Sequence, residues 1–194
     1  MAFLKSARVT LASLAVLCLG TIAAPAANAY SPDIDGDGIP NTWEMKGYDA
    51  DGDGKIDVDF PAMGADPNHK DIFVEMDYMA GLLPSEDELD RITKIYADLP
   101  MRNPDGTTGV NIHLDAGSAR SAKYNLGGGN EVVHEQLDNT MTKWAEIRAK
   151  NMDPYRESVF HYMIWGDSYG DRGSSGQGWV GGRGFIVTVG PRFW

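Results

Sequence analysis

The sequence predicts an α/β domain, built on a largely parallel mixed sheet with helices and preceded by a short acidic segment. Two observations carry this prediction. Between residues 71 and 190 the apolar pattern alternates between the two periods typical of strands and helices, in the order β-α-β-α-β-β, which favours parallel strands joined by helices. The chain has 194 residues, enough for one ordinary domain after loss of an N-terminal leader.

The first 29 residues have the pattern of a secretory signal peptide. Lys5 and Arg8 precede an apolar run over residues 11–24, and small residues ending at Ala29 follow. This run is shorter than the roughly 20 residues that a membrane-spanning helix needs. A lipid anchor on Cys18 is disfavoured by the large residue before it. We therefore predict cleavage after Ala29 and a secreted, extracellular protein that makes no membrane contact afterwards.

Charge and cysteine content restrict the function further. Removing residues 1–29 takes away two positive charges and no negative ones, so the formal net charge changes from −11 to −13. This balance disfavours a nucleic-acid partner, because binding nucleic acid depends on basic surface. The single cysteine, Cys18, lies in the leader, so no disulfide can brace the secreted protein. Another stabilising element is expected.

The stretch DIDGDGIPNTWE, residues 33–44, supplies such an element. It follows the pattern D-x-D-x-D-G-x5-E of calcium-binding loops without a mismatch. A solvated acidic linker, the alternative, would need neither the glycine in the sixth position nor the closing glutamate. The predicted calcium ligands are Asp33, Asp35, Asp37, the Ile39 carbonyl, Asn41 and Glu44.

A second loop, DADGDGKIDVDF, follows at residues 49–60. Its predicted calcium ligands are Asp49, Asp51, Asp53, the Lys55 carbonyl and Asp57. Phe60 occupies the closing position, so Asp59 or a group from elsewhere must close the loop and the site should be weaker. The two loops resemble the tandem calcium repeats of thrombospondin type 3 and of many bacterial exported proteins.

The regular elements follow in order. DIFVEMDYM (71–79) alternates as a strand with one face more apolar than the other. The stretch between Pro84 and Pro100 has the capping box Ser85–Glu88 and an apolar stripe, which predicts a helix. GVNIHLD (109–115) is the next strand, with its three aliphatic residues facing inward.

The second half continues the alternation. A helix is predicted over about residues 130–150, on a stripe formed by Val133, Leu137, Met141, Trp144 and Arg148. SVFHYMIWG and RGFIVTVG are predicted as two further strands. Between them, residues 166–184 are rich in glycine but lack the G-K-[ST] of a phosphate loop, so they are interpreted as a flexible connection or cleft rim.

The predicted helix also carries three candidate residues for a zinc site. His134 and Asp138 are spaced as i and i+4, so a helix would place both on one face, with Glu135 as a general base. Both lie on the wet side of the stripe, which favours a plain surface helix. His113 and His161 fall within strands and have no ligand-spaced companion. Calcium is therefore the expected cofactor, and zinc is the alternative.

Three longer phrases carry a resemblance. FPAMGADPNHKDIFVEMDYM, NPDGTTGVNIHLDAG and FHYMIWGDSYGDRGSSGQGW…GFIVTVG resemble the front part of bacterial secreted, zincin or metzincin-type metallopeptidase-like proteins, over residues 33–190. The resemblance implies the succession strand, helix, strand, helix and a cleft-lining edge strand, followed by a zinc helix with H-E-x-x-H. The sequence ends at GPRFW, where that helix would be expected, and contains no H-E-x-x-H. No zinc ligand or catalytic residue of the family has a matching position here.

The expected organisation is a leader (1–29), tandem calcium loops (30–62) and a metallopeptidase-like α/β domain lacking the zinc helix (63–194). The expected function is a secreted calcium-binding protein that is not proteolytic as given and presents its cleft rim to a protein, a peptide or a cell-wall polymer. The alternative is an active secreted zinc metallopeptidase, using either His134, Glu135 and Asp138 or a zinc helix missing from this chain.

Overall fold

A computed structural model describes residues 32–170, 174–178 and 180–189, so the predicted leader lies outside the described residues. In chain order the helices are α1 (Asn41–Lys46), α2 (Phe60–Met63), α3 (Glu86–Ala97) and α4 (Thr142–Asn151). The strands are β1 (Asp71–Met79), β2 (Asn111–Asp115), β3 (Glu131–Val132), β4 (His161–Gly166), β5 (Gly176–Gly178) and β6 (Gly184–Thr188). No helix within the described ranges is long and apolar enough to cross a membrane.

The strands form one mixed, mostly parallel sheet, which confirms the predicted α/β class. Its order is β2-β1-β4-β6-β5, with the short β3 paired to the C-terminal end of β1. The pairs β1–β2, β1–β4 and β4–β6 are parallel, whereas β5 runs antiparallel to β6 at one edge. β1 therefore lies inside the sheet, between β2 and β4.

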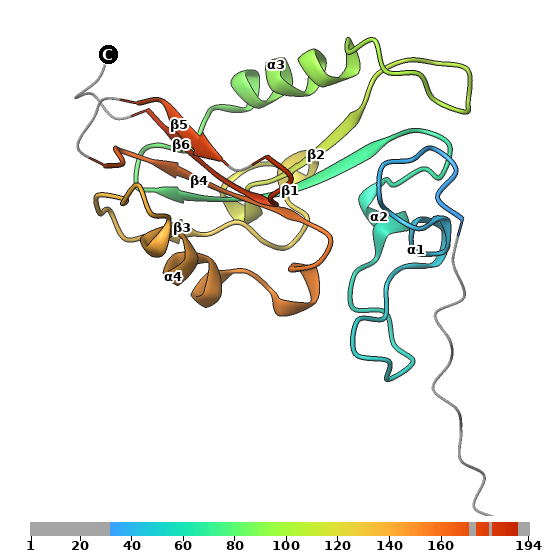
Figure 1. Cartoon of the computed structure of the whole chain (residues 1–194), viewed down its shortest axis with the longest axis horizontal. Coiled ribbons are helices and arrows are strands. Elements are labelled where there is room, and N and C mark those ends of the chain that lie inside the picture. The colour runs from blue at the N-terminus through green and yellow to red at the C-terminus, as the bar shows by residue number, and fades with distance from the viewer. Residues whose placement is uncertain (1–31, 171–173, 179, 190–194) are drawn as a thin grey trace, which may run out of the picture. The chain divides into compact units, whose positions relative to one another are not determined.

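Helices cover the sheet on opposite faces, α3 on one and α4 on the other (Figure 1). Val74 and Met76 of β1 pack in the hydrophobic cluster that includes Leu89 of α3. Phe73 and Met79 pack in the cluster that includes Trp144 of α4. The second face of β1 is less apolar, as predicted, because it also carries Glu75 and Asp77, but it is buried as well. A strand covered on both faces belongs in the middle of an α/β sheet.

The predicted capping box fixes the start of α3. The Ser85 hydroxyl accepts a hydrogen bond from the Glu88 amide at 3.4 Å, and the Glu88 carboxylate accepts one from the Ser85 amide at 2.8 Å. These contacts satisfy amide groups that a helix start leaves without partners. The helix ends at Ala97, just before the predicted limit.

The predicted helix over residues 130–150 is wrong in its first half, because α4 begins only at Thr142. Residues 131–132 form β3, and the Leu137 backbone then makes an isolated bridge with Tyr169. Val133 is 77% exposed, so it is no part of a buried helical stripe. Leu137 and Met141 are buried, but they lie in an irregular segment. Their apolar side chains have the four-residue spacing of a helix although no helix forms there.

The segment of residues 32–63, which contains the two acidic loops, α1 and α2, packs into the same core as the sheet. An antiparallel bridge joins Tyr48 to Val58 in this segment. Phe60, at the start of α2, is fully buried, and its ring lies 5.0 Å from that of Phe73 in an edge-on arrangement. Aromatic pairs of this geometry stabilise beyond the area that they bury. The loops and α1 and α2 consequently lie beside the N-terminal end of β1 (Figure 1).

Candidate metal centre

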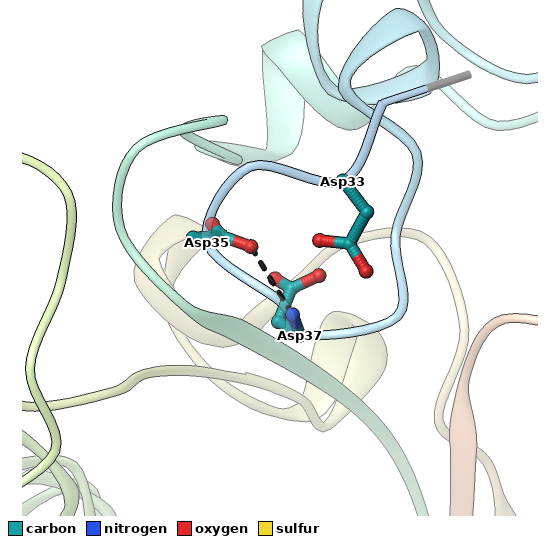
Figure 2. Close-up of side chains that lie close together, drawn as sticks. All are labelled: Asp33, Asp35 and Asp37. Atoms are coloured by element: carbon teal, nitrogen blue, oxygen red, sulfur yellow. Dashed lines mark hydrogen bonds between the residues drawn. The ribbon is translucent and has the colours of Figure 1, made fainter.

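The first predicted calcium loop is folded by its own aspartates and glycines. The Asp33 carboxylate accepts hydrogen bonds from the Gly36 amide at 2.7 Å and the Gly38 amide at 3.1 Å. Both glycines have positive φ, +76° and +94°, which side-chain-bearing residues rarely adopt. Figure 2 shows the carboxylates of Asp33, Asp35 and Asp37 turned toward one another inside the loop.

Two of these aspartates use one oxygen to hold the turn. One Asp35 oxygen accepts from the Asp37 amide at 3.1 Å, and one Asp37 oxygen accepts from the Ile39 amide at 2.7 Å. Asp35 is only 5% exposed, yet its Oδ2 has no hydrogen-bond partner. Buried carboxylate oxygens are nearly always paired, so this oxygen is available to a hydrogen-bond donor or a cation.

Glu44, the predicted closing ligand of the first loop, lies in α1 and is buried. Its side chain is 2% exposed, and neither carboxylate oxygen has a hydrogen-bond partner. Asn41, also predicted as a ligand, accepts a hydrogen bond from the Ile34 amide at 2.9 Å and so ties α1 to the loop. Ile39 contributes its side chain to the hydrophobic core.

The electrostatics of this loop favour a bound cation. Burial and the neighbouring Asp37, Asp35 and Asp71 raise the pKa of Glu44 to about 8. Burial and Asp37 raise the pKa of Asp35 to about 6. Within the described residues, none of Asp33, Asp35, Asp37 and Glu44 forms a salt bridge with a basic side chain. Carboxyl groups crowded in this way resist ionisation unless a positive charge joins them.

Two overlapping groups of carboxylates could hold a metal ion here. An oxygen from each of Asp33, Asp35 and Asp37 lies within 4.8 Å of the others, and the same holds for Asp37, Glu44 and Asp71. The sequence motif does not include Asp71, which is the first residue of β1. The motif over residues 33–44 could not indicate Asp71, because this residue comes from a distant part of the chain.

The second loop has the same turn but a different environment. Asp49, Asp51 and Asp53 form a third group within 4.8 Å, and Asp51 and Asp53 are exposed. The amine of Lys55 lies 2.6 Å from Asp53 and lowers the pKa of that carboxyl group. Asp57, predicted as a ligand, accepts a hydrogen bond from the Ala50 amide at 2.8 Å.

Asp59 was one of the two closing groups considered for the second loop, the other being a group from elsewhere in the chain. Asp59 caps α2 by accepting a hydrogen bond from the Ala62 amide at 3.1 Å. The group of three aspartates therefore includes neither Asp57 nor Asp59.

The weak zinc candidates do not share a helix. His134 and Asp138 both precede α4, so the i, i+4 argument for a common face does not apply. Asp138 instead accepts amide hydrogen bonds from Thr142 at 3.0 Å and Lys143 at 2.7 Å, which fixes the start of the helix. Glu135 lies 3.6 Å from the Lys143 amine. All three metal-capable groups found in the described ranges consist of carboxylates alone.

A second buried acidic cluster lies further along β1 and is paired with an arginine side chain. One guanidinium nitrogen of Arg156 lies 3.1 Å from Glu75 and 2.8 Å from Asp115, and all three residues are buried. Burial raises the pKa of Glu75 to about 7 although Arg156 acts in the opposite direction. A Cβ on Gly128 would lie 2.4 Å from a Glu75 oxygen, so backbone packs closely against this cluster. The other Glu75 oxygen, Oε1, is buried without a hydrogen-bond partner, but here Arg156 supplies a positive charge beside the carboxylate.

No family model matches this chain, and comparison with curated proteins and with solved structures gives no match. Its function is therefore inferred from the residues and their geometry.

Proposed function

We propose that the first loop binds calcium and that the ion braces the α/β domain of a secreted protein. One observation carries this proposal: Glu44 and Asp35 are at least 95% buried and together leave three carboxylate oxygens without a hydrogen-bond donor. An unpaired buried carboxylate is strongly unfavourable, whereas one bound to a cation is not. The loop is therefore arranged for a positive partner that no basic side chain of the described residues supplies to these carboxylates.

The ligand chemistry favours calcium over other cations. Asp33, Asp35, Asp37 and Glu44 offer only oxygen, and their number suits the six to eight oxygen ligands that calcium takes. Zinc in proteins usually takes nitrogen or sulfur from histidine or cysteine, and magnesium usually keeps several of its waters. A buried glutamate that can offer both oxygens also supports the larger ion.

The resemblance to the front part of secreted metallopeptidase-like proteins enters the proposal only through the order of the elements. β1, α3, β2 and α4 follow the strand, helix, strand, helix that this resemblance implies, whereas β3 precedes α4 and the internal strand β4 precedes the edge strand β5. We propose that the chain is such a domain without proteolytic activity of its own. The sequence contains no H-E-x-x-H, and the residues considered in its place, His134, Glu135 and Asp138, do not meet on one helix. A peptide or cell-wall polymer as partner remains part of this proposal.

Calorimetric titration of the chelator-treated protein tests the calcium proposal. We expect calcium to bind with a dissociation constant between about 10⁻⁶ and 10⁻³ M, and magnesium to bind more weakly. Asp35→Asn should weaken the binding, and Asp98→Asn, which removes an exposed carboxylate just after α3, should leave it unchanged. A wild-type protein that binds no calcium would remove the proposal.

Metal analysis and a casein digest test the absence of proteolysis. We expect substoichiometric zinc and intact casein, because zinc catalysis needs about three protein ligands around one ion together with a general base. One zinc per chain, lost together with casein cleavage in His134→Ala, would overturn this expectation and favour an active peptidase.

A further inference from the structure

Asp71 connects the first loop to the sheet. It is the first residue of β1 and only 1% exposed. Its backbone amide donates a hydrogen bond to the Asp37 carboxylate at 2.7 Å. Its own carboxylate lies in one group with those of Asp37 and Glu44, with an oxygen of each within 4.8 Å of the others. The loop and the strand thus meet through three acidic residues.

The Asp71 carboxylate is held in place from the sheet side. One oxygen accepts a hydrogen bond from the Asp66 amide at 2.8 Å, and the other lies 2.5 Å from Nε2 of His113 on β2. The His113 ring is itself stacked on Phe73, with 4.3 Å between the ring centres. Each carboxylate oxygen has two lone pairs, so one on each oxygen is still free to bind a cation.

Glu44 faces this fixed carboxylate without any donor. It is 2% exposed, both of its oxygens lack partners, and Asp37 and Asp71 are among the charges that raise its pKa. Hydrogen bonds from His113 and from the Asp66 amide satisfy Asp71 but leave Glu44 alone. Carboxylates brought this close repel one another, and either a proton on one of them or a cation between them relieves the repulsion.

We propose that Asp71 is a metal ligand, so that the cation bound by the first loop also joins this loop to strand β1. This inference rests on the proposed calcium binding and names a further residue of the same site. The ion then links three parts of the chain: the loop, α1 through Glu44, and β1 through Asp71. Through His113, the position of the ion also depends on β2.

Asp71→Asn tests the proposal, with Asp98→Asn as the matched control for loss of one negative charge. We expect the asparagine at position 71 to lower the calcium affinity of the first loop by tenfold or more and the control to change it less than twofold, both by calorimetric titration. Calcium binding by wild type with an undiminished affinity in Asp71→Asn would overturn this inference and leave the proposed function standing. Absence of calcium binding in wild type would overturn both.

Hydrogen exchange on the wild-type protein gives a second readout if Asp71→Asn does not fold. Amides of residues 66–73 and of β2 should become protected on calcium addition together with those of residues 33–44, because the ion would hold both sides. Protection confined to residues 33–44 would show that the ion does not reach the sheet and would overturn the inference.

Discussion

The two acidic loops share one backbone turn but differ in what surrounds it. In the first loop, the Asp33 carboxylate accepts from the amides of Gly36 and Gly38; in the second, Asp49 accepts from those of Gly52 and Gly54 in the same way. The distances agree within 0.2 Å, so the repeated motif alone sets the turn.

The difference lies in burial and in the source of positive charge. The first loop is closed by the buried Glu44, whose oxygens have no partner. The second has Phe60 at that position, and Lys55 already neutralises Asp53 at the surface. A motif therefore specifies a turn, and the rest of the fold decides how strongly that turn requires a metal ion.

Glu44→Gln should show the largest difference between the loops. The amide offers one oxygen in place of two and no charge, so we expect first-loop calcium affinity to fall about 100-fold, or roughly 2.7 kcal/mol. Asp57→Asn in the second loop should leave this affinity unchanged. Calorimetric titration of both variants measures the effect, and equal losses in the two would contradict the comparison.

Calcium should stabilise the fold mainly through the first loop. We expect millimolar calcium to raise the free energy of unfolding by about 1 to 3 kcal/mol for each filled site, so chelation should lower the melting temperature by several degrees. Scanning calorimetry with calcium and with chelator gives the shift. In Glu44→Gln most of the shift should disappear. A wild-type melting curve that chelator leaves unchanged would exclude a stabilising ion.

The calcium affinities of the two loops should also depend differently on pH. In the ion-free protein the pKa of Glu44 is raised to about 8, above its ordinary value of 4.5, so folding favours its protonated form. The ion-free protein should then lose stability through Glu44 as pH rises from 4.5 toward 8. Calcium must displace this proton, so first-loop affinity should fall as pH is lowered from 8 to 6.

The second loop should respond less over this pH range, because Lys55 lowers the pKa of Asp53. Titrations at pH 6, 7 and 8 measure both affinities. A first-loop affinity independent of pH would contradict the buried, uncompensated state of Glu44.

Lys55→Gln should give the smallest effect. The lysine amine and Asp53 are both exposed, and exposed ion pairs contribute little. Removing the lysine frees one Asp53 oxygen, so we expect second-loop calcium affinity to rise about two- to fivefold. Calcium titration at low ionic strength detects the change. A decrease in affinity would mean that Lys55 supports the loop rather than competing with the ion.

Local patterns accounted for much of the fold. The bounds of β1 agree with the predicted strand at both ends, and α3 agrees with its capping box, because alternation and capping depend on neighbouring residues. The predicted start of the second helix was wrong because of contacts with distant parts of the chain. β3 pairs with β1, and the Leu137 amide donates a hydrogen bond to the Ser168 carbonyl, so an apolar spacing of four arises without a helix. Sequence spacing cannot register such long-range pairing.

The candidate site divides in the same way. The turn-forming aspartates follow from a motif confined to residues 33–44. The burial of Glu44 and the approach of Asp71 depend on how β1 packs against the loop, and the pairing of Glu75 with Arg156 joins residues far apart in sequence. None of these has a local signal. A buried acidic residue in a strand, such as Glu75, only indicates that some partner must exist.

The central position of β1 also bears on the time course of folding. β1 is made first, but its neighbours come much later along the chain: Asp71 pairs with Asn111, and Val74 with His161. Pairings over such distances form slowly, because a long loop must close before any contact rewards it. Until β2 and β4 have formed, both edges of this nine-residue strand stay open, and such edges can pair with other chains. The strand at the centre of the finished sheet is thus open to intermolecular pairing while the sheet is being assembled, and its three acidic residues oppose that pairing by charge repulsion.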